Sequence, residues 1–239
     1  YVVVGINHTY GAIHTLFPDG RQVGVNHDAL PDGVSDKEYD QASDILSRQW
    51  TEDIDLVLDK LAKWNELEEE WFLAGGLDLD KVGVFGHSTG GGAVVRFCLT
   101  DVRCQAVLGM DAWVEPAQIA VREIVLRKPA LLMYSETWNS RDEEDRNPGL
   151  LRELVEKANN TVIEITIEGT RHYDFSSLPM LSPLTITLGL KGPIDGDLVL
   201  EIINAETVGF FDRYLRDDRS ISLQGISERY PEVLFVVKP

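Results

Sequence analysis

The chain has 239 residues, of which 44% are hydrophobic and 26% charged, as is typical of one folded globular domain. Its formal net charge of −18 argues against nucleic acids and anionic membrane surfaces as partners, because like charges repel. No apolar run approaches the roughly 20 residues that a membrane-spanning helix needs.

The first third of the chain contains three predicted elements. An apolar, β-branched run predicts a buried strand over residues 1–6. A Pro-Asp-Gly turn at 18–20, between Thr-Leu-Phe at 15–17 and Gln-Val-Gly-Val at 22–25, predicts a hairpin. Apolar residues at helical spacing predict one or two helices over 37–66.

From residue 81 onwards, short apolar runs alternate with helical patterns. The predicted strands cover 81–85, 106–110, 130–134 and 161–167, and the predicted helices cover 93–99, 148–158 and 198–215. Strands that alternate with helices favour an α/β fold with a mostly parallel sheet, covered by helices on both faces. Since no internal repeat or linker is visible, we interpret residues 1–239 as a single domain.

The two cysteines, Cys98 and Cys104, form no Cys-x-x-Cys pair, and no nearby histidines complete a zinc site. Their spacing fits a local disulfide as well as two buried thiols. We expect neither a metal nor an organic cofactor.

The stretch from Gly86 to Gly90 reads Gly-His-Ser-Thr-Gly and matches the pattern G-x-S-x-G. It follows a predicted strand and precedes a predicted helix, which is the context of a nucleophile elbow. The glycines let the chain turn tightly beside the neighbouring strand and helix. Ser88 is therefore the candidate nucleophile, and the Thr89 N–H is the expected oxyanion donor. A phosphate-binding P-loop would need Lys where this chain has Ala93.

A serine hydroxyl needs a neighbouring base to become a good nucleophile. Of the five histidines, only His172 follows Ser88 in the chain, as the base does in folds with this elbow. His172 lies shortly after the strand 161–167, where a loop can reach the same edge of the sheet. His87 is next to the nucleophile, and we expect it to point away and to pack.

The acid of such a site holds the imidazole in place and stabilises its charged form. Asp111 ends the strand that follows the elbow helix, whereas Glu136 and Asp142 follow the next strand, the more usual place for the acid. Spacing alone leaves all three open.

Six segments are similar to one known family: GHSTGG at 86–91, LGMDAW at 108–113, LLMYSE at 131–136, GTRH at 169–172, LKGPID at 190–195 and FFDRYL at 210–215. Through them the chain resembles the plasma-type platelet-activating-factor acetylhydrolases and their bacterial relatives, which are serine esterases with the α/β-hydrolase fold. The resemblance spans most of residues 1–216. It implies that Asp111 is the acid and that the reaction is a calcium-independent hydrolysis of an ester with a short acyl group.

The start of the chain departs from the family pattern. The family has an earlier strand whose His-Gly loop supplies the second oxyanion N–H, and residues 1–8 best match the strand after that loop. We therefore expect an N-terminally incomplete hydrolase domain, with its first strands and the second donor outside the chain. No targeting segment is visible, so a secreted and a cytoplasmic location both stay open.

The sequence thus predicts a serine esterase that acts on a small-molecule or lipid ester through an acyl-serine. An esterase of the dienelactone-hydrolase or cutinase type is the main rival on the same fold. A peptidase, a thioesterase and a non-catalytic protein that kept the fold also stay open. The oligomeric state is not indicated.

Overall fold

The computed structural model describes residues 1–67, 71–139, 145–177 and 183–238. The chain divides into two compact units, Tyr1–Leu79 and Asp80–Pro239. The interpretation of 1–239 as one domain stays a prediction.

The first unit contains a hairpin and a long helix. Strands β1 (His14–Leu16) and β2 (Gln22–Gly24) pair antiparallel, which confirms the predicted hairpin. A short turn, η1 (His27–Ala29), leads towards α1 (Asp36–Leu67), so the helical pattern forms one helix of 32 residues.

The predicted strand over residues 1–6 is wrong. These residues have no regular secondary structure, and the side chains of Tyr1, Val2, Val3 and Val4 are exposed. A β-strand exists only where a neighbour accepts its backbone hydrogen bonds. The described residues contain no strand that pairs with this segment, so its apolar, β-branched composition is not sufficient.

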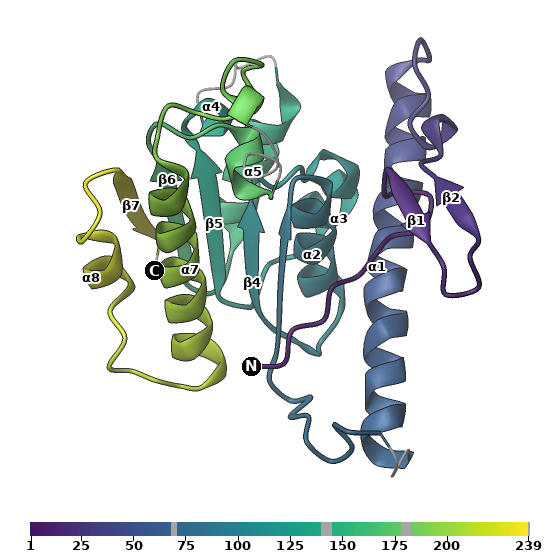
Figure 1. Cartoon of the computed structure of the whole chain (residues 1–239), viewed down its shortest axis with the longest axis horizontal. Helices are drawn as coiled ribbons and strands as arrows, with labels where there is room; N and C mark the ends of the chain where they lie inside the picture. Colours follow the sequence, from purple (N-terminus) through teal and green to yellow (C-terminus); the bar gives the residue numbers. More distant parts are fainter. Residues whose placement is uncertain (68–70, 140–144, 178–182, 239) are drawn as a thin grey trace. The chain divides into compact units, whose positions relative to one another are not determined.

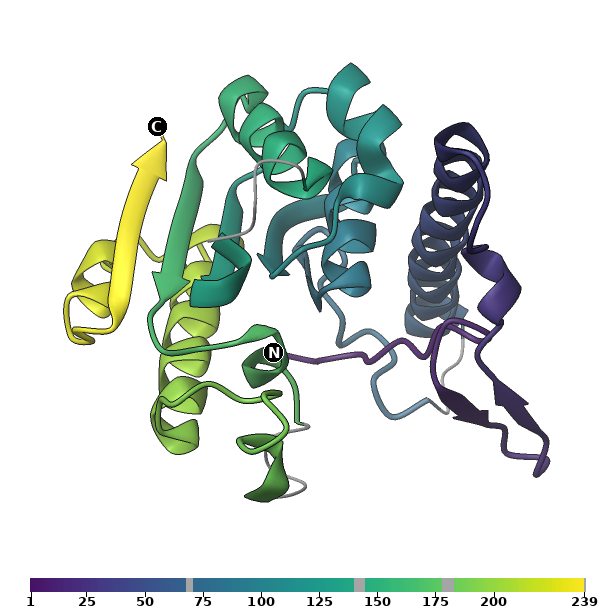
Figure 2. The ribbon, with the colours of Figure 1, turned by 90° about the horizontal axis from the view of Figure 1, so that it is seen from above.

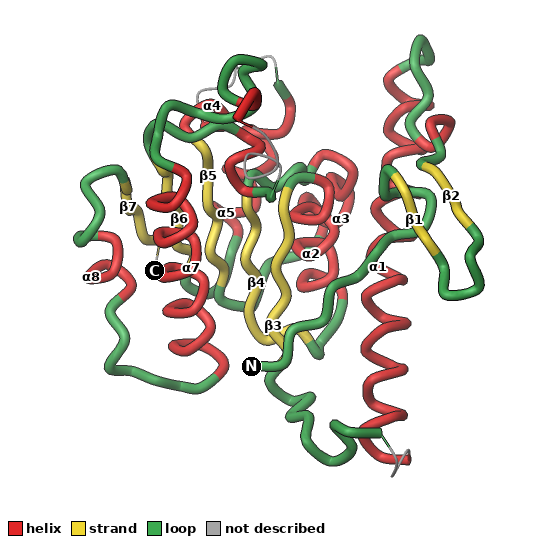
Figure 3. Tube along the Cα trace, viewed as in Figure 1, coloured by secondary structure: helices red, strands yellow, loops and turns green. Residues whose placement is uncertain are grey.

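The second unit is built on a five-stranded sheet, which can be followed in Figures 1 and 3. Its strands, in spatial order, are β3 (Val82–His87), β4 (Cys104–Met110), β5 (Ala130–Ser135), β6 (Val162–Ile167) and β7 (Val233–Lys238). The first four are parallel, and β7 pairs antiparallel with β6. The predicted mostly parallel sheet is confirmed, whereas β7 was not predicted.

Helices cover the sheet (Figure 2). They are α2 (Thr89–Thr100), α3 (Gln118–Glu123), α4 (Glu136–Asn139), α5 (Arg146–Lys157), α7 (Gly196–Leu215) and α8 (Leu223–Ser227), with short turns at η2 (Glu115–Ala117), η3 (His172–Phe175) and η4 (Pro183–Thr185). None of the described helices is both long and apolar enough to cross a membrane.

Helices α2 and α7 lie on opposite faces of the sheet. A Cβ added to Gly109 of β4 would meet Val95 of α2, and one added to Gly83 of β3 would meet Phe211 of α7. Gly83 pairs with Ala106, which points away from the Gly109 face because strand residues alternate between faces. The predicted coverage of both faces is therefore confirmed.

The α7 face holds the main apolar core. Its fully buried side chains come from three neighbouring strands and from α7 and include Ala106, Leu108, Leu131, Met133, Ile165, Ile167, Ile202 and Phe210. Interiors packed in this way resist deformation. The core therefore gives rigid support to the strand ends.

The cysteines form a disulfide between Cys98 of α2 and Cys104 at the start of β4. Both residues are buried. Of the two interpretations that the sequence left open, the disulfide is the one that the structure contains.

Candidate active site

The predicted elbow is a sharp turn between β3 and α2. Ser88 has φ of 55° and ψ of −121°, a backbone conformation that costs a non-glycine residue energy. Two backbone hydrogen bonds hold it: the Ser88 N–H donates to the Met110 carbonyl, and the Ser88 carbonyl accepts from the Trp113 N–H, both at 2.9 Å. The strained serine is therefore fixed to the end of β4.

The glycines of the elbow are not equivalent. A Cβ on Gly86 would lie 2.4 Å from the Gly90 carbonyl oxygen, and one on Gly92 would lie 2.0 Å from the Trp113 carbonyl oxygen. A Cβ on Gly90 would meet nothing within 4 Å. A larger residue would therefore collide at Gly86, the first glycine of the G-x-S-x-G pattern, but not at Gly90, the second. Gly92, which lies outside the pattern, also has no room for a side chain.

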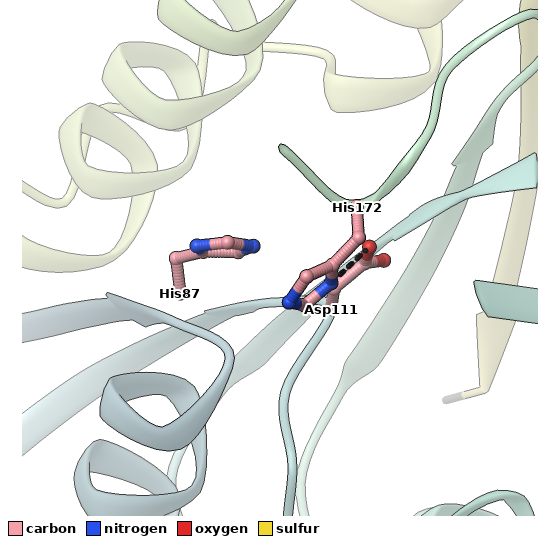
Figure 4. A group of neighbouring side chains, drawn as sticks. All are labelled: His87, Asp111 and His172. Carbon is pink, nitrogen blue, oxygen red and sulfur yellow. Dashed lines mark hydrogen bonds and ion pairs between the residues drawn. The ribbon is translucent and has the colours of Figure 1, made fainter. Parts of the chain in front are cut away.

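His172 lies between Ser88 and Asp111. It begins η3, shortly after the end of β6, and its Nε2 lies 3.1 Å from the Ser88 Oγ. Its Nδ1 lies 3.0 Å from Oδ2 of Asp111, the contact drawn in Figure 4. The Asp111 side chain is completely buried, whereas that of His172 is 24% exposed. The structure thus brings together the three residues that the sequence singled out.

Asp111, like Ser88, has a positive φ, of 42°. Its N–H donates to the Met133 carbonyl at 2.8 Å, which fixes the strained residue to β5. Asp is one of the few residues that tolerate this region, because its short polar side chain forms local hydrogen bonds.

Of the other two candidate acids, Glu136 has no described contact with His172. Glu136 begins α4, is exposed, and accepts a 2.7 Å hydrogen bond from the Gly169 N–H. Asp142 lies outside the described residues. Of these three carboxyl groups, Asp111 is therefore the one with a described contact to the imidazole.

Thr89 is the first residue of α2 and directly follows Ser88. The first N–H groups of a helix have no acceptor within the helix, and the helix dipole favours negative charge there. The position suits the predicted role of the Thr89 N–H as an oxyanion donor.

Two residues at the site were missed from the sequence. Ser135, at the end of β5, donates to Asp111 through its N–H at 2.7 Å and through its hydroxyl at 2.6 Å. Trp138, in α4, stacks on the His172 ring, with centroids 4.6 Å apart and planes 12° from parallel. A serine at the C-terminal end of a parallel strand was the only available signal, since ligand sites form at that edge.

His87 does not point away from the site. Its ring centroid lies 4.4 Å from that of His172, and its Nε2 is buried without a hydrogen-bond partner among the described residues. Burial of the ring lowers the pKa of His87 to about 4, and the charge of a protonated His172 contributes in the same direction. A neutral His87 therefore packs against the His172 ring. A packing or hydrogen-bonding role was expected for it, but its place was not.

The same residues offer a set of potential metal ligands. One donor atom each of His87, Asp111 and His172 lies within 4.8 Å of the other two (Figure 4). Asp111 and His172 already form a hydrogen bond with each other. Nitrogen and carboxylate donors of this kind suit zinc and similar ions.

The loop that carries His172 is pinned by Asp174. This buried carboxylate accepts hydrogen bonds from the N–H groups of Arg171, at 2.8 Å, and of Gly192, at 2.7 Å. Both bonds go to charged acceptors and are stronger than neutral ones. His172 therefore sits on a turn that is held on both sides.

Comparisons with known proteins agree with this fold. The family described as "Platelet-activating factor acetylhydrolase, isoform II" matches residues 49–224. The platelet-activating factor acetylhydrolase of Cavia porcellus is 27% identical over 62% of this chain and 33% of its own length. That of Gallus gallus is 26% identical over 72% of this chain and 38% of its own length.

The chain thus spans between a third and two fifths of these two curated relatives. A solved structure, a ferulic acid esterase from Streptomyces cinnamoneus, superposes with a TM-score of 0.73 at 23% identity, over 96% of this chain and 64% of that one. At that identity the likeness shows the fold, which is that of an α/β-hydrolase. The family match covers well over half of the chain, so this protein belongs to the family of platelet-activating factor acetylhydrolases, isoform II.

Proposed function

We propose that this chain is a serine-dependent carboxylic ester hydrolase, with Ser88 as nucleophile, His172 as base and Asp111 as acid. One observation carries the proposal. His172 contacts the Ser88 hydroxyl through one ring nitrogen and the buried Asp111 through the other, at 3.1 and 3.0 Å. This is the arrangement in which an imidazole can take the hydroxyl proton while a carboxylate stabilises the resulting charge.

The reaction would proceed in two steps. Ser88 Oγ attacks the ester carbonyl as its proton passes to Nε2 of His172, and the Thr89 N–H stabilises the oxyanion. The C–O bond of the ester then breaks, the alcohol leaves with the proton from His172, and an acyl-serine remains. In the second step, water gives a proton to His172 and attacks the acyl group. The bond between the acyl carbon and Ser88 Oγ then breaks, Ser88 Oγ takes the proton back from His172, and the acid is released.

We propose an ester with a short acyl group as the substrate, such as an acetyl ester of a small molecule or a lipid. The support is the family, whose named relatives are acetylhydrolases of platelet-activating factor. The reaction needs no metal at any step, because the imidazole activates the nucleophile.

The test is steady-state hydrolysis of p-nitrophenyl esters from acetyl to octanoyl, with thioester and anilide analogues beside them. We expect turnover of the acetyl ester and its loss in Ser88→Ala, with a slower reaction as the acyl chain lengthens. Hydrolysis that survives in Ser88→Ala would contradict the serine mechanism. A preference for anilides or thioesters would replace the ester assignment by that of a peptidase or a thioesterase.

A further inference from the structure

The hydrogen bond to Asp111 leaves one motion of the base unrestrained. It holds one edge of the His172 ring, but the ring can still tilt about that contact. Asp174 holds the backbone of the short turn that carries His172, but the His172 side chain is 24% exposed, so its surroundings do not enclose the ring on every side. A catalytic ring that tilts away from Ser88 loses the alignment on which proton transfer depends.

Ser135 fixes the carboxylate. Its N–H bonds Oδ1 of Asp111 and its hydroxyl bonds Oδ2, the same oxygen that contacts His172. With a donor on each oxygen, the plane of the carboxylate is set. Both hydrogen bonds are buried and have a carboxylate as acceptor. Hydrogen bonds of this kind are among the strongest in proteins, so they hold the carboxylate firmly.

Trp138 fixes the ring. Its indole lies nearly parallel to the imidazole, at 4.6 Å between centroids, and its side chain is 5% exposed. A buried, close-packed partner on one face prevents the ring from tilting towards that side. His87, tilted by 41° against the same imidazole, adds a further contact.

The two restraints are linked through one oxygen. The backbone N–H of Trp138 donates to Oγ of Ser135 at 3.2 Å. A hydroxyl that accepts there directs its single proton elsewhere, and Asp111 at 2.6 Å is a closer acceptor than the Thr137 hydroxyl at 3.4 Å. The turn from β5 into α4 thus orients the Ser135 hydroxyl, and this hydroxyl in turn orients the Asp111 carboxylate.

We propose that Ser135 and Trp138 are positioning residues, by which the turn from β5 into α4 aligns both Asp111 and His172 for the reaction. The inference rests on the proposed serine mechanism. Neither residue exchanges a proton with the substrate; each acts through a triad side chain. Their removal should therefore lower kcat and leave KM nearly unchanged.

The chain offers a matched control for Ser135→Ala. Ser227 is also buried and also donates its hydroxyl to a buried carboxylate, Glu206, at 2.6 Å. Ser227→Ala therefore removes the same kind of bond at a place outside the site. Trp138→Phe, which keeps an aromatic ring, is the conservative partner of Trp138→Leu.

The experiment measures kcat and KM for an acetyl ester, per active site titrated with a fluorophosphonate. We expect kcat to fall roughly 10- to 100-fold in Ser135→Ala and Trp138→Leu, with KM within about twofold. Trp138→Phe should recover most of the loss, and Ser227→Ala should keep kcat. Wild-type kcat in both Ser135→Ala and Trp138→Leu would overturn the proposal.

A proton NMR spectrum supplies a readout that does not depend on turnover. The low-field resonance of the proton between His172 and Asp111 should shift or broaden in Ser135→Ala and stay unchanged in Ser227→Ala. An unchanged resonance in Ser135→Ala would count against the proposal. If Ser88→Ala kept its activity, the serine mechanism would fail, and this resonance would still decide whether Ser135 holds the pair.

Discussion

Backbone strain and buried hydrogen bonds coincide at the residues of the site. Ser88 and Asp111 both have positive φ, and both are held by backbone hydrogen bonds to a neighbouring strand. Strain of this kind persists only where the surroundings enforce it, and it concentrates at functional sites. The hydrogen bonds of Asp111 also separate it from Glu136, a distinction that sequence spacing could not make.

The choice of acid can be tested directly. Asp111→Asn keeps the shape of the side chain but removes the charge that stabilises the imidazolium, so kcat should fall by a factor on the order of 10⁴. Glu136→Gln should keep kcat within about a few-fold, because Glu136 contacts the Gly169 N–H and not the imidazole. Steady-state kinetics of the two variants with an acetyl ester shows which of the two carboxyl groups acts as the acid. A larger loss in Glu136→Gln would transfer the acid role.

His87 should make stability depend on pH. Folding lowers its pKa from 6.5 to about 4, so between these values the unfolded chain binds a proton that the folded chain does not. Stability therefore decreases as pH falls through this window. His87→Gln should remove up to about 3 kcal/mol of that decrease. Urea unfolding of the wild type and of His87→Gln at about pH 7.5 and about pH 4.5 measures this difference. An equal decrease in stability in the two proteins would contradict the assignment of the pH dependence to His87.

At the scale of elements, four parallel strands bring the site together. The chain segments that follow β3, β4 and β6 carry Ser88, Asp111 and His172, and β5 ends in Ser135. The C-terminal ends of parallel strands share one edge of a sheet, so residues up to 84 positions apart meet there. The sheet is thus the element that determines the geometry of the site.

Glycines allow α2 to pack closely against the segment after β4, and Gly92 makes the closer approach of the two glycines there, Gly91 and Gly92. In Gly92→Ala the new Cβ would collide with the Trp113 carbonyl, and we expect a loss of about 1–3 kcal/mol. Gly90→Ala meets open space inside the same helix and should be neutral or gain up to about 1 kcal/mol. Urea unfolding of both variants measures the difference. Equal stabilities would show that α2 can shift to relieve the collision.

The disulfide between α2 and β4 should stabilise the fold. A link between residues six apart restricts the unfolded chain and is expected to contribute about 2 kcal/mol. A reductant should therefore lower the urea midpoint of the wild type. The Cys98→Ala/Cys104→Ala double variant, which has no link to lose, should not respond to the reductant. An unchanged midpoint in the reduced wild type would show that the link contributes nothing.

For the molecule as a whole, the sequence correctly predicted the elements that local patterns specify. The parallel strands, the helices between them and the hairpin follow from periodicity and turn residues, and all are present. The predictions that failed concern segments whose strand formation depends on a partner far away in the sequence. Residues 1–6 have the composition of a strand but pair with no strand among the described residues, whereas β7 forms because β6, some 70 positions earlier, pairs with it.

The site shows the same division. Ser88 and His172 could be named from a local motif and from chain order. The acid could not be chosen from spacing, because Asp111 and Glu136 both follow strands at the same edge. No linear pattern encodes side-chain geometry. The roles of Ser135 and Trp138 and the place of His87 could therefore not be predicted from the sequence.

The measurement that tests the central claim most directly is covalent labelling of the whole chain with a fluorophosphonate, followed by peptide mapping. A base-activated serine reacts with this probe, so we predict one adduct, on Ser88, and none in Ser88→Ala. Asp111→Asn should label much more slowly. A folded chain, verified by circular dichroism, that takes no label on Ser88 or takes it equally well in Asp111→Asn would contradict the proposed triad.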